Sequence, residues 1–256
     1  MKLAITFFLI CIHISFINAQ DIECPKPQII GVFEQNGYQI IYPFGWSESG
    51  NFAYILQDLN LNESSDYVFK AVIQNMKSDS VLWYKDIVFS ADDNPDIHWD
   101  CECDYTIDGD VDYMKKYNHS FLEKVIWPKH KNEIITAIED FNIKVDPQSL
   151  LKLSDLAKSK IMIEEIKSKY EDYCIEKYEI VLKENNKVKK VVYSYHTPKD
   201  QSLCGRNSSG IWYRDFSVEG YFKSPFDDQI AIVVFEKTNG YEETFEKPFL
   251  VGTNFL

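Results

Sequence analysis

Two short apolar runs, far apart along the chain, dominate the pattern of hydrophobic and polar positions. Residues 52–56 follow a polar turn at 48–51, and residues 230–235 follow a polar turn at 227–229. Both runs are too short for a typical helix, lack strict alternation with polar residues, and are rich in β-branched or aromatic side chains. This pattern is typical of strands covered on both faces. We expect both strands to share one core.

Further strand patterns surround these two runs. Turn residues such as Asn36-Gly37 and Asn239-Gly240 separate short apolar or alternating segments. Pro43 is expected to stop one of these strands. The segments are residues 29–33, 38–42, 67–74, 81–84, 174–182, 188–195 and 243–251.

The period changes in the middle of the chain. From Tyr117 onward, apolar residues recur at spacings of three and four, which is typical of one face of a helix. A first helical piece is expected to break at Trp127-Pro128, since proline cannot continue a helix interior. Further helices are expected after this break, at residues 131–140, 147–153 and 155–170.

These patterns predict an α+β fold with antiparallel β-sheet, as a blade-like meander, at both ends of the mature chain and a helical insert between them. No low-complexity tract or long linker divides the chain, so we expect a single domain over residues 20–256. Its expected parts are a β meander at 29–90, an acidic loop at 91–112, a helical insert at 113–171 and β hairpins at 173–251.

The first residues indicate export. Lys2, an apolar run over residues 3–17 and the small residue Ala19 match a secretory signal peptide cleaved after Ala19. The run is shorter than the ~20 apolar residues of a membrane-spanning helix. Lipid attachment at Cys11 is disfavoured, because Ile10 stands where a small residue is expected. We therefore expect a secreted or periplasmic protein without a transmembrane segment.

The charge narrows the choice of partners. The full chain of 256 residues carries a formal charge of −13, which becomes −14 when Lys2 leaves with residues 1–19. An acidic surface repels phosphate backbones and anionic membranes at long range. We therefore expect no nucleic-acid partner, and the charge itself favours solubility.

Disulfides are expected in the oxidising compartment that the signal peptide implies, but their pairing stays open. An odd count leaves at least one thiol free or intermolecular. Cys101 and Cys103 are too close in sequence for an easy bridge within an extended strand. A zinc site formed by this pair and His98 is the alternative, without a second ligand pair of suitable spacing. The cysteines of the mature chain are Cys24, Cys101, Cys103, Cys174 and Cys204.

An unusually acidic segment raises the hypothesis of a calcium-binding site. Asp108, Asp110 and Asp112 alternate with other residues, and hard cations prefer several carboxylate oxygens. The EF-hand order fails, because glycine falls second and His119 occupies the twelfth position. A solvated acidic loop is therefore favoured over a calcium site.

No motif assigns a catalytic, cofactor-binding or metal-binding residue. The Gly45-Trp46-Ser47-Glu48-Ser49 stretch resembles a nucleophile elbow but lacks the second glycine and precedes a strand. A cysteine nucleophile beside His98 or His196, or a glycosidase carboxylate pair among forty acidic residues, stays open.

Aromatic residues near strand ends offer a binding hypothesis. Exposed rings can stack on sugars or peptides, although most strand aromatics form core. The residues in question are Tyr42, Phe44, Trp46, Trp83, Trp99, Trp212 and Tyr213.

The stretch Gly45-Trp46-Ser47-Glu48-Ser49-Gly50-Asn51-Phe52-Ala53 resembles the blade motif of TolB-like or WD-type propellers, without its Pro and Asp. Lys223-Ser224-Pro225-Phe226-Asp227-Asp228-Gln229-Ile230-Ala231 is a second, partial copy without the Trp and Gly. The chain is also similar to uncharacterised secreted bacterial proteins with such a hairpin. The resemblance implies blade-like sheet and no activity.

The sequence therefore favours a non-enzymatic binding module for a protein or glycan partner, without a cofactor. The alternative is an extracytoplasmic hydrolase with no recognisable motif. A pocket with paired carboxylates, or a nucleophile beside a histidine, would favour the enzyme. A flat aromatic patch would favour binding.

Overall fold

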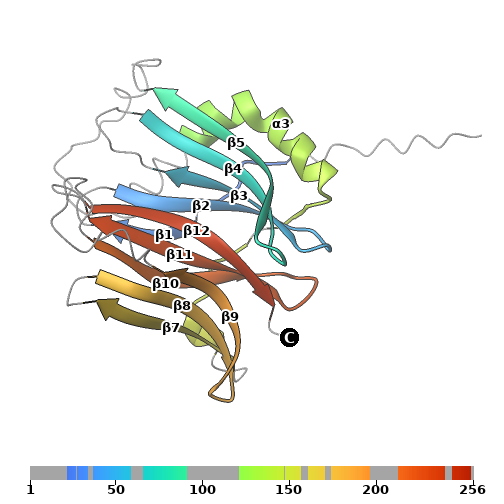
Figure 1. The fold of residues 1–256 in the computed structure, drawn as a ribbon. Coiled ribbons are helices and arrows are strands. Elements are labelled where there is room, and N and C mark those ends of the chain that lie inside the picture. The colour runs from blue at the N-terminus through green and yellow to red at the C-terminus, as the bar shows by residue number, and fades with distance from the viewer. Residues whose placement is uncertain are drawn as a thin grey trace, which may run out of the picture.

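Three antiparallel sheets and one long helix make up most of the computed structural model in the part of the chain that it describes (Figure 1). The described residues are 22–26, 28–33, 37–58, 66–90, 121–146, 148–156, 161–170, 174–196, 213–239 and 244–254. The prediction of an α+β fold dominated by antiparallel sheet is confirmed at this level. The predicted signal peptide and acidic loop lie outside the described residues.

The first sheet is the meander that the sequence predicts between residues 29 and 90. Its strands follow one another in the order β1-β2-β3-β4-β5, and the two-residue strand β6 also pairs with β2. The strands are β1 (Gln28–Phe33), β2 (Gly37–Trp46), β3 (Asn51–Asp58), β4 (Asp66–Asn75), β5 (Ser80–Ser90) and β6 (Lys144–Val145).

Pro43 does not stop its strand, contrary to the prediction, because β2 continues to Trp46. β1 pairs with β2 only as far as Ile41, and β6 joins the same side of β2 only from Gly45 onward. Pro43 lies between these two partners, where a missing backbone N–H costs no ladder hydrogen bond. Gly45 lets β6 approach, since a Cβ atom there would lie 2.1 Å from the carbonyl oxygen of Lys144.

The other two sheets contain three strands each and confirm the predicted hairpins between residues 173 and 251. The second sheet has the order β10-β11-β12, and the third has the order β7-β8-β9. Their strands are β10 (Tyr213–Lys223), β11 (Gln229–Asn239), β12 (Thr244–Asn254), β7 (Ile161–Tyr170), β8 (Cys174–Glu184) and β9 (Lys187–His196).

The helical insert is confirmed only in its first half. A π-helix, η2 (Leu122–Ile126), leads directly into α3 (Trp127–Asp140), so the break expected at Pro128 is a junction between two helical forms. The N–H of Trp127 donates to the carbonyl of Leu122, and Pro128 occupies the first turn of α3, where its missing N–H is tolerated.

The helices predicted for the second half of the insert are wrong. Residues 148–152 are not helical, and Leu151 forms an isolated antiparallel bridge with Tyr221 of β10. Among the described residues of this segment, one helical turn, α4 (Leu153–Leu156), precedes β7, and β7 replaces the helix predicted up to residue 170. Isoleucines in β7 fit either period, and pairing with β8 along the whole strand decides between them. Ile163 then packs between the second and third sheets.

The layers are stacked as α3, first sheet, second sheet and third sheet (Figure 1). Along β3, Ala53 and Ile55 face the helix, while Phe52 and Tyr54 face the second sheet. Successive residues of a strand point to opposite faces, so a strand between two layers needs apolar residues at every position. This confirms the prediction that residues 52–56 are buried on both faces.

The second apolar run is buried in the same way. Ala231, Val233 and Phe235 of β11 face the first sheet. The alternate residues, Ile230, Ile232 and Val234, face the third sheet. Phe52 and Ala231 belong to one core cluster, so the expectation of a shared core between the two runs is confirmed.

Candidate functional site

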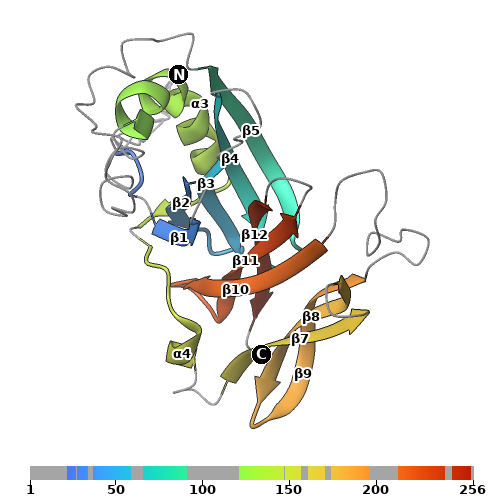
Figure 2. The ribbon, with the colours of Figure 1, turned by 90° about the vertical axis from the view of Figure 1, so that its left-hand side faces the viewer.

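The outer edge of β5 is the candidate site. Within the described residues, β5 pairs with β4 alone and ends the first sheet. Figure 2 shows it at the outer margin of that sheet. The strand is eleven residues long, and its only charged residues are Lys85 and Asp86. A long edge strand with few charges is a template for pairing with another chain.

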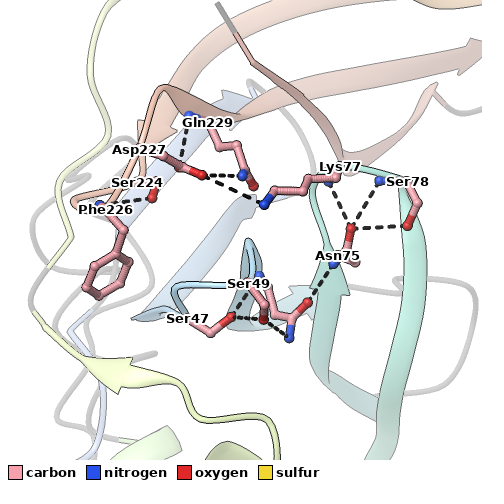
Figure 3. Close-up of polar contacts among 10 residues, drawn as sticks. Ser47, Ser49, Asn75, Lys77, Ser78, Ser224, Phe226, Asp227 and Gln229 are labelled. Atoms are coloured by element: carbon pink, nitrogen blue, oxygen red, sulfur yellow. Dashed lines mark hydrogen bonds and ion pairs between the residues drawn. The ribbon is translucent and has the colours of Figure 1, made fainter.

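The turn before β5 is held firmly by hydrogen bonds. The side-chain oxygen of Asn75 accepts the backbone N–H groups of Lys77 and Ser78, at 3.0 and 3.1 Å. The same side chain donates to Asn51 Oδ1 at 2.8 Å, which connects this turn to the turn between β2 and β3 (Figure 3). The edge strand therefore starts from an ordered position.

Four large apolar side chains of β5 are exposed. The exposed fractions are 53% for Val81, 41% for Leu82, 57% for Tyr84 and 64% for Val88. In contrast, Ile87 is buried in the core beneath α3. Adjacent exposed apolar residues of this kind mark an interaction surface more often than scattered ones do.

The exposure has a simple architectural cause. Tyr84 lies opposite Val72 of β4, and Val72 is buried against the second sheet. The second sheet has three strands and ends at β12, so its cover stops between β4 and β5. Tyr84 and Val88 continue the same face of the first sheet beyond this cover.

The two charges of β5 are paired within the protein. Asp86 Oδ1 lies 3.5 Å from Lys70 Nζ, which also lies 4.6 Å from the centre of the Tyr84 ring. Lys85 forms an ion pair with Glu133 of α3. Burial and the neighbouring Lys85 charge lower the pKa of His130 on the same helix. Neither charge of β5 stands alone to repel an approaching strand.

Both edge strands of the second sheet, in contrast, form hydrogen bonds with other parts of the chain. On β12, the carbonyl of Leu250 accepts a hydrogen bond from Gln74 Nε2 at 3.1 Å, and the N–H of Gly252 donates to Asp79 Oδ1. Pro248, two positions earlier on the same side, has no N–H. On β10, Tyr221 exchanges two backbone hydrogen bonds with Leu151, at 2.9 and 3.0 Å.

The edges of the third sheet are protected by charge. β9 carries Lys187, Lys189 and Lys190, and Lys190 Nζ donates to Thr253 Oγ1 of β12 at 3.1 Å. β7 has four charged residues among ten, and its Lys167 lies 2.8 Å from Asp215. Charged edge strands resist pairing with other chains. β9 and β7 also expose apolar residues, namely Val188, Val191, Met162 and Ile166, but these lie among the charges. β5 combines eleven residues and four exposed apolar side chains with only two charges, both paired within the protein.

Ser47 does not act as a nucleophile in this geometry. Its side chain is 1% exposed, and its Oγ accepts the N–H of Asn51 at 3.0 Å and lies 2.8 Å from Ser49 Oγ (Figure 3). These bonds close the turn between β2 and β3. The interpretation of this stretch as a structural turn is thus supported.

A serine and a histidine do meet on β9, but in the wrong order for catalysis. Ser194 Oγ lies 3.2 Å from His196 Nε2 and 3.5 Å from Glu179 Oε1, and both hydrogen bonds are exposed. A hydrolytic triad places the histidine between the serine and the acid. Here the serine lies in the middle, and no acid of the described residues lies on the far side of the histidine in this group.

The expectation that most strand aromatics form core is confirmed for three of the seven residues, which excludes them from the aromatic binding hypothesis. Tyr42, Phe44 and Trp46 are buried in the core, and Trp83 packs partly buried beneath α3. Trp99, Trp212 and the side chain of Tyr213 lie outside what the structure describes. Tyr84, which the sequence interpretation omitted, is exposed. Its position next to Trp83 was the available signal, because neighbouring strand residues face opposite sides.

Only some of the residues in the cysteine and metal hypotheses lie in the described part of the chain. Cys24 is a free thiol, half-buried against the core beneath α3. Burial, followed by the nearby charge of Glu123, raises its pKa to about 12. The described part of the chain holds no group of His, Cys, Asp and Glu suited to a metal ion. The other candidates lie outside this part, namely Cys101, Cys103, the side chain of Cys174, Cys204, His98, Asp108, Asp110 and Asp112.

Comparisons with family models, with curated proteins and with solved structures find no match for this chain. The resemblance to TolB-like or WD-type blades therefore stays a prediction. No helix among the described residues is both long and apolar enough to cross a bilayer.

Proposed function

We propose that this protein is a secreted or periplasmic, non-enzymatic binding module that takes up an extended segment of a protein partner as an additional strand on β5. The observation that carries the proposal is the eleven-residue outer edge of the first sheet, which pairs with no other described strand and has exposed apolar side chains. Strand addition supplies affinity through main-chain hydrogen bonds and specificity through alternate side chains.

The free energy expected from adding a strand to β5 corresponds to a moderate affinity. Covering a half-exposed valine, leucine or tyrosine side chain contributes about 1 kcal/mol. Main-chain hydrogen bonds add to this, while ordering the segment opposes it. We therefore expect dissociation constants of about micromolar size.

The partner segment is expected to be neutral or basic. The chain carries a formal charge of −13, which repels acidic segments before contact. A protein segment is favoured over a glycan because the predicted aromatic rings of β2 are buried and the exposed surface is a strand edge.

Peptide binding tests this function. The probe is a labelled nine-residue peptide of alternating valine and threonine with a lysine at each end, measured by fluorescence anisotropy and hydrogen exchange. We expect saturable binding that protects amides of β5. A peptide N-methylated at alternate positions cannot complete the ladder and is expected not to bind.

Matched variants locate the site. Val88→Lys places a charge on the exposed face of β5 and is expected to weaken binding at least tenfold. Val191→Lys makes the same change at an exposed valine of β9 and is expected to leave binding unchanged. Protection of amides elsewhere, or equal binding by both variants, would exclude β5 as the site.

A further inference from the structure

The exposed face of β5 has an ordered chemistry that goes beyond being apolar. Tyr84, Asp86 and Val88 alternate with residues of the other face, so they present an apolar, an acidic and an apolar side chain in sequence. The exposed fractions are 57% for Tyr84 and 64% for Val88, and 54% of the Asp86 side chain is exposed. All three side chains are accessible to residues of an added strand.

Asp86 can accept a second cation. Its ion pair with Lys70 joins two side chains that are 54% and 42% exposed, at 3.5 Å. Pairs this exposed contribute little and do not saturate a carboxylate, which has two oxygens and about four acceptor positions. Lys70 approaches from β4, so the side of Asp86 toward the free edge is the side that an added strand would occupy.

The opposite face of β5 offers no comparable charge. Lys85 is held by Glu133 of α3, and Ile87 is buried beneath that helix. A partner residue on that face meets a paired lysine and a covered apolar residue. Selection by charge is therefore expected on the Asp86 face alone.

Resting on the proposed function of β5, we propose that this edge selects segments of the pattern apolar–any–basic–any–apolar, with the lysine or arginine opposite Asp86. Residues directly opposite in a sheet have Cβ atoms about 4.5–5.5 Å apart, within reach of a charge pair. The pattern is the same in both chain directions, so it applies to parallel and antiparallel addition. The basic residue also agrees with the negative charge of the whole protein.

Three peptides that differ only in the central residue test this selection. Their common frame is valine–threonine–X–threonine–valine, extended at both ends by threonine and lysine, with X as lysine, glutamine or glutamate. For the unchanged protein at low salt, we expect affinity to fall about 2- to 5-fold from lysine to glutamine and again from glutamine to glutamate. Added salt should reduce both steps.

Reversing the charge of Asp86 tests whether the central residue of the bound peptide lies opposite this side chain. Asp86→Lys is expected to invert the order of the three peptides, and Asp86→Asn to remove most of the preference. Glu219→Lys is the matched control, because it changes the net charge equally at an exposed position of β10. It is expected to preserve the original order.

The outcomes separate the two proposals. Equal affinity of all three peptides, with β5 amides still protected, would overturn the selection by Asp86 and leave the strand-addition site in place. An inverted order with Glu219→Lys would show a net-charge effect and also overturn the selection. Binding of none of the peptides would overturn both proposals.

Discussion

The rings of Phe52 and Phe222 lie 5.3 Å apart, centre to centre, and join two strands that are distant in the chain. Phe52 belongs to β3 of the first sheet, and Phe222 to β10 of the second. Trp46 contacts Phe52 from the same side at 4.7 Å. This aromatic group holds the two sheets together and so positions β5 beyond the margin of the second sheet.

Removal of either ring should destabilise the protein strongly. Phe52→Ala and Phe222→Ala each create a cavity between the sheets and are expected to lower the free energy of unfolding by about 3–5 kcal/mol. The double variant should lose less than the sum, by about 0.5–1.5 kcal/mol, because the ring contact is shared. Chemical denaturation measures these values. Tyr84→Ala is the control and should change stability by no more than about 0.5 kcal/mol.

Gly50 is expected to tolerate no side chain. Its φ is +90°, and a Cβ atom would lie 2.1 Å from Gln229 Oε1, a buried atom without a hydrogen-bond partner among the described residues. Gly50→Ala should therefore cost about 2–4 kcal/mol of stability. Adding Gln229→Ala relieves the collision but not the backbone strain, so the double variant should recover about 1 kcal/mol relative to the sum. Additive losses in thermal melts would contradict this contact.

Asp79 connects the turn before β5 to β12 and should be replaceable by asparagine but not by alanine. Its Oδ1 accepts the N–H of Gly252, and its φ is +55°, which asparagine tolerates. Asp79→Ala leaves a partly buried N–H unpaired and is expected to cost about 1–3 kcal/mol. Asp79→Asn keeps an acceptor and should cost less. Equal losses for the two variants would assign the effect to something other than this hydrogen bond.

The charge of Asp79 should also make stability depend on pH. Burial raises the pKa of this carboxyl in the folded protein, although the bond from Gly252 and the charge of Lys190 oppose the rise. The folded state thus binds the proton more tightly than the unfolded state does. The stability that this group contributes is present below its unfolded pKa and is lost as the pH rises through its folded pKa. Relative to the unchanged protein, Asp79→Asn should therefore gain stability as the pH rises above about 4, the usual pKa of an aspartate.

Cys24 should react slowly while the protein is folded. Its pKa is raised to about 12, and the thiolate is the nucleophilic form. Alkylation by iodoacetamide at pH 8, followed by peptide mapping, should be about 100-fold slower or more than in urea. An equal rate in the folded and unfolded chain would show that the thiol is not covered beneath α3.

Local chemistry alone predicts much of the sheet framework. The apolar run at residues 230–235 identifies β11, because only a strand between two layers has apolar residues on both faces. Asn36-Gly37 predicts the hairpin between β1 and β2, and Asn185-Asn186, both with positive φ, closes that between β8 and β9. These features depend on a few neighbouring residues, so they can be predicted from the sequence without knowing which layer faces the strand.

Other features depend on partners that are distant in sequence, and only the tertiary structure decides them. The segment Ile161–Tyr170 becomes a strand because β8 supplies a pairing edge, although its lysines and isoleucines also fit a helix. Trp46 is core because the second sheet covers it, and Tyr84 is exposed because that cover ends at β12. Propensity and periodicity describe which face of a strand is apolar. Whether that face meets another layer or remains open for a partner is set by how far each sheet extends over the next.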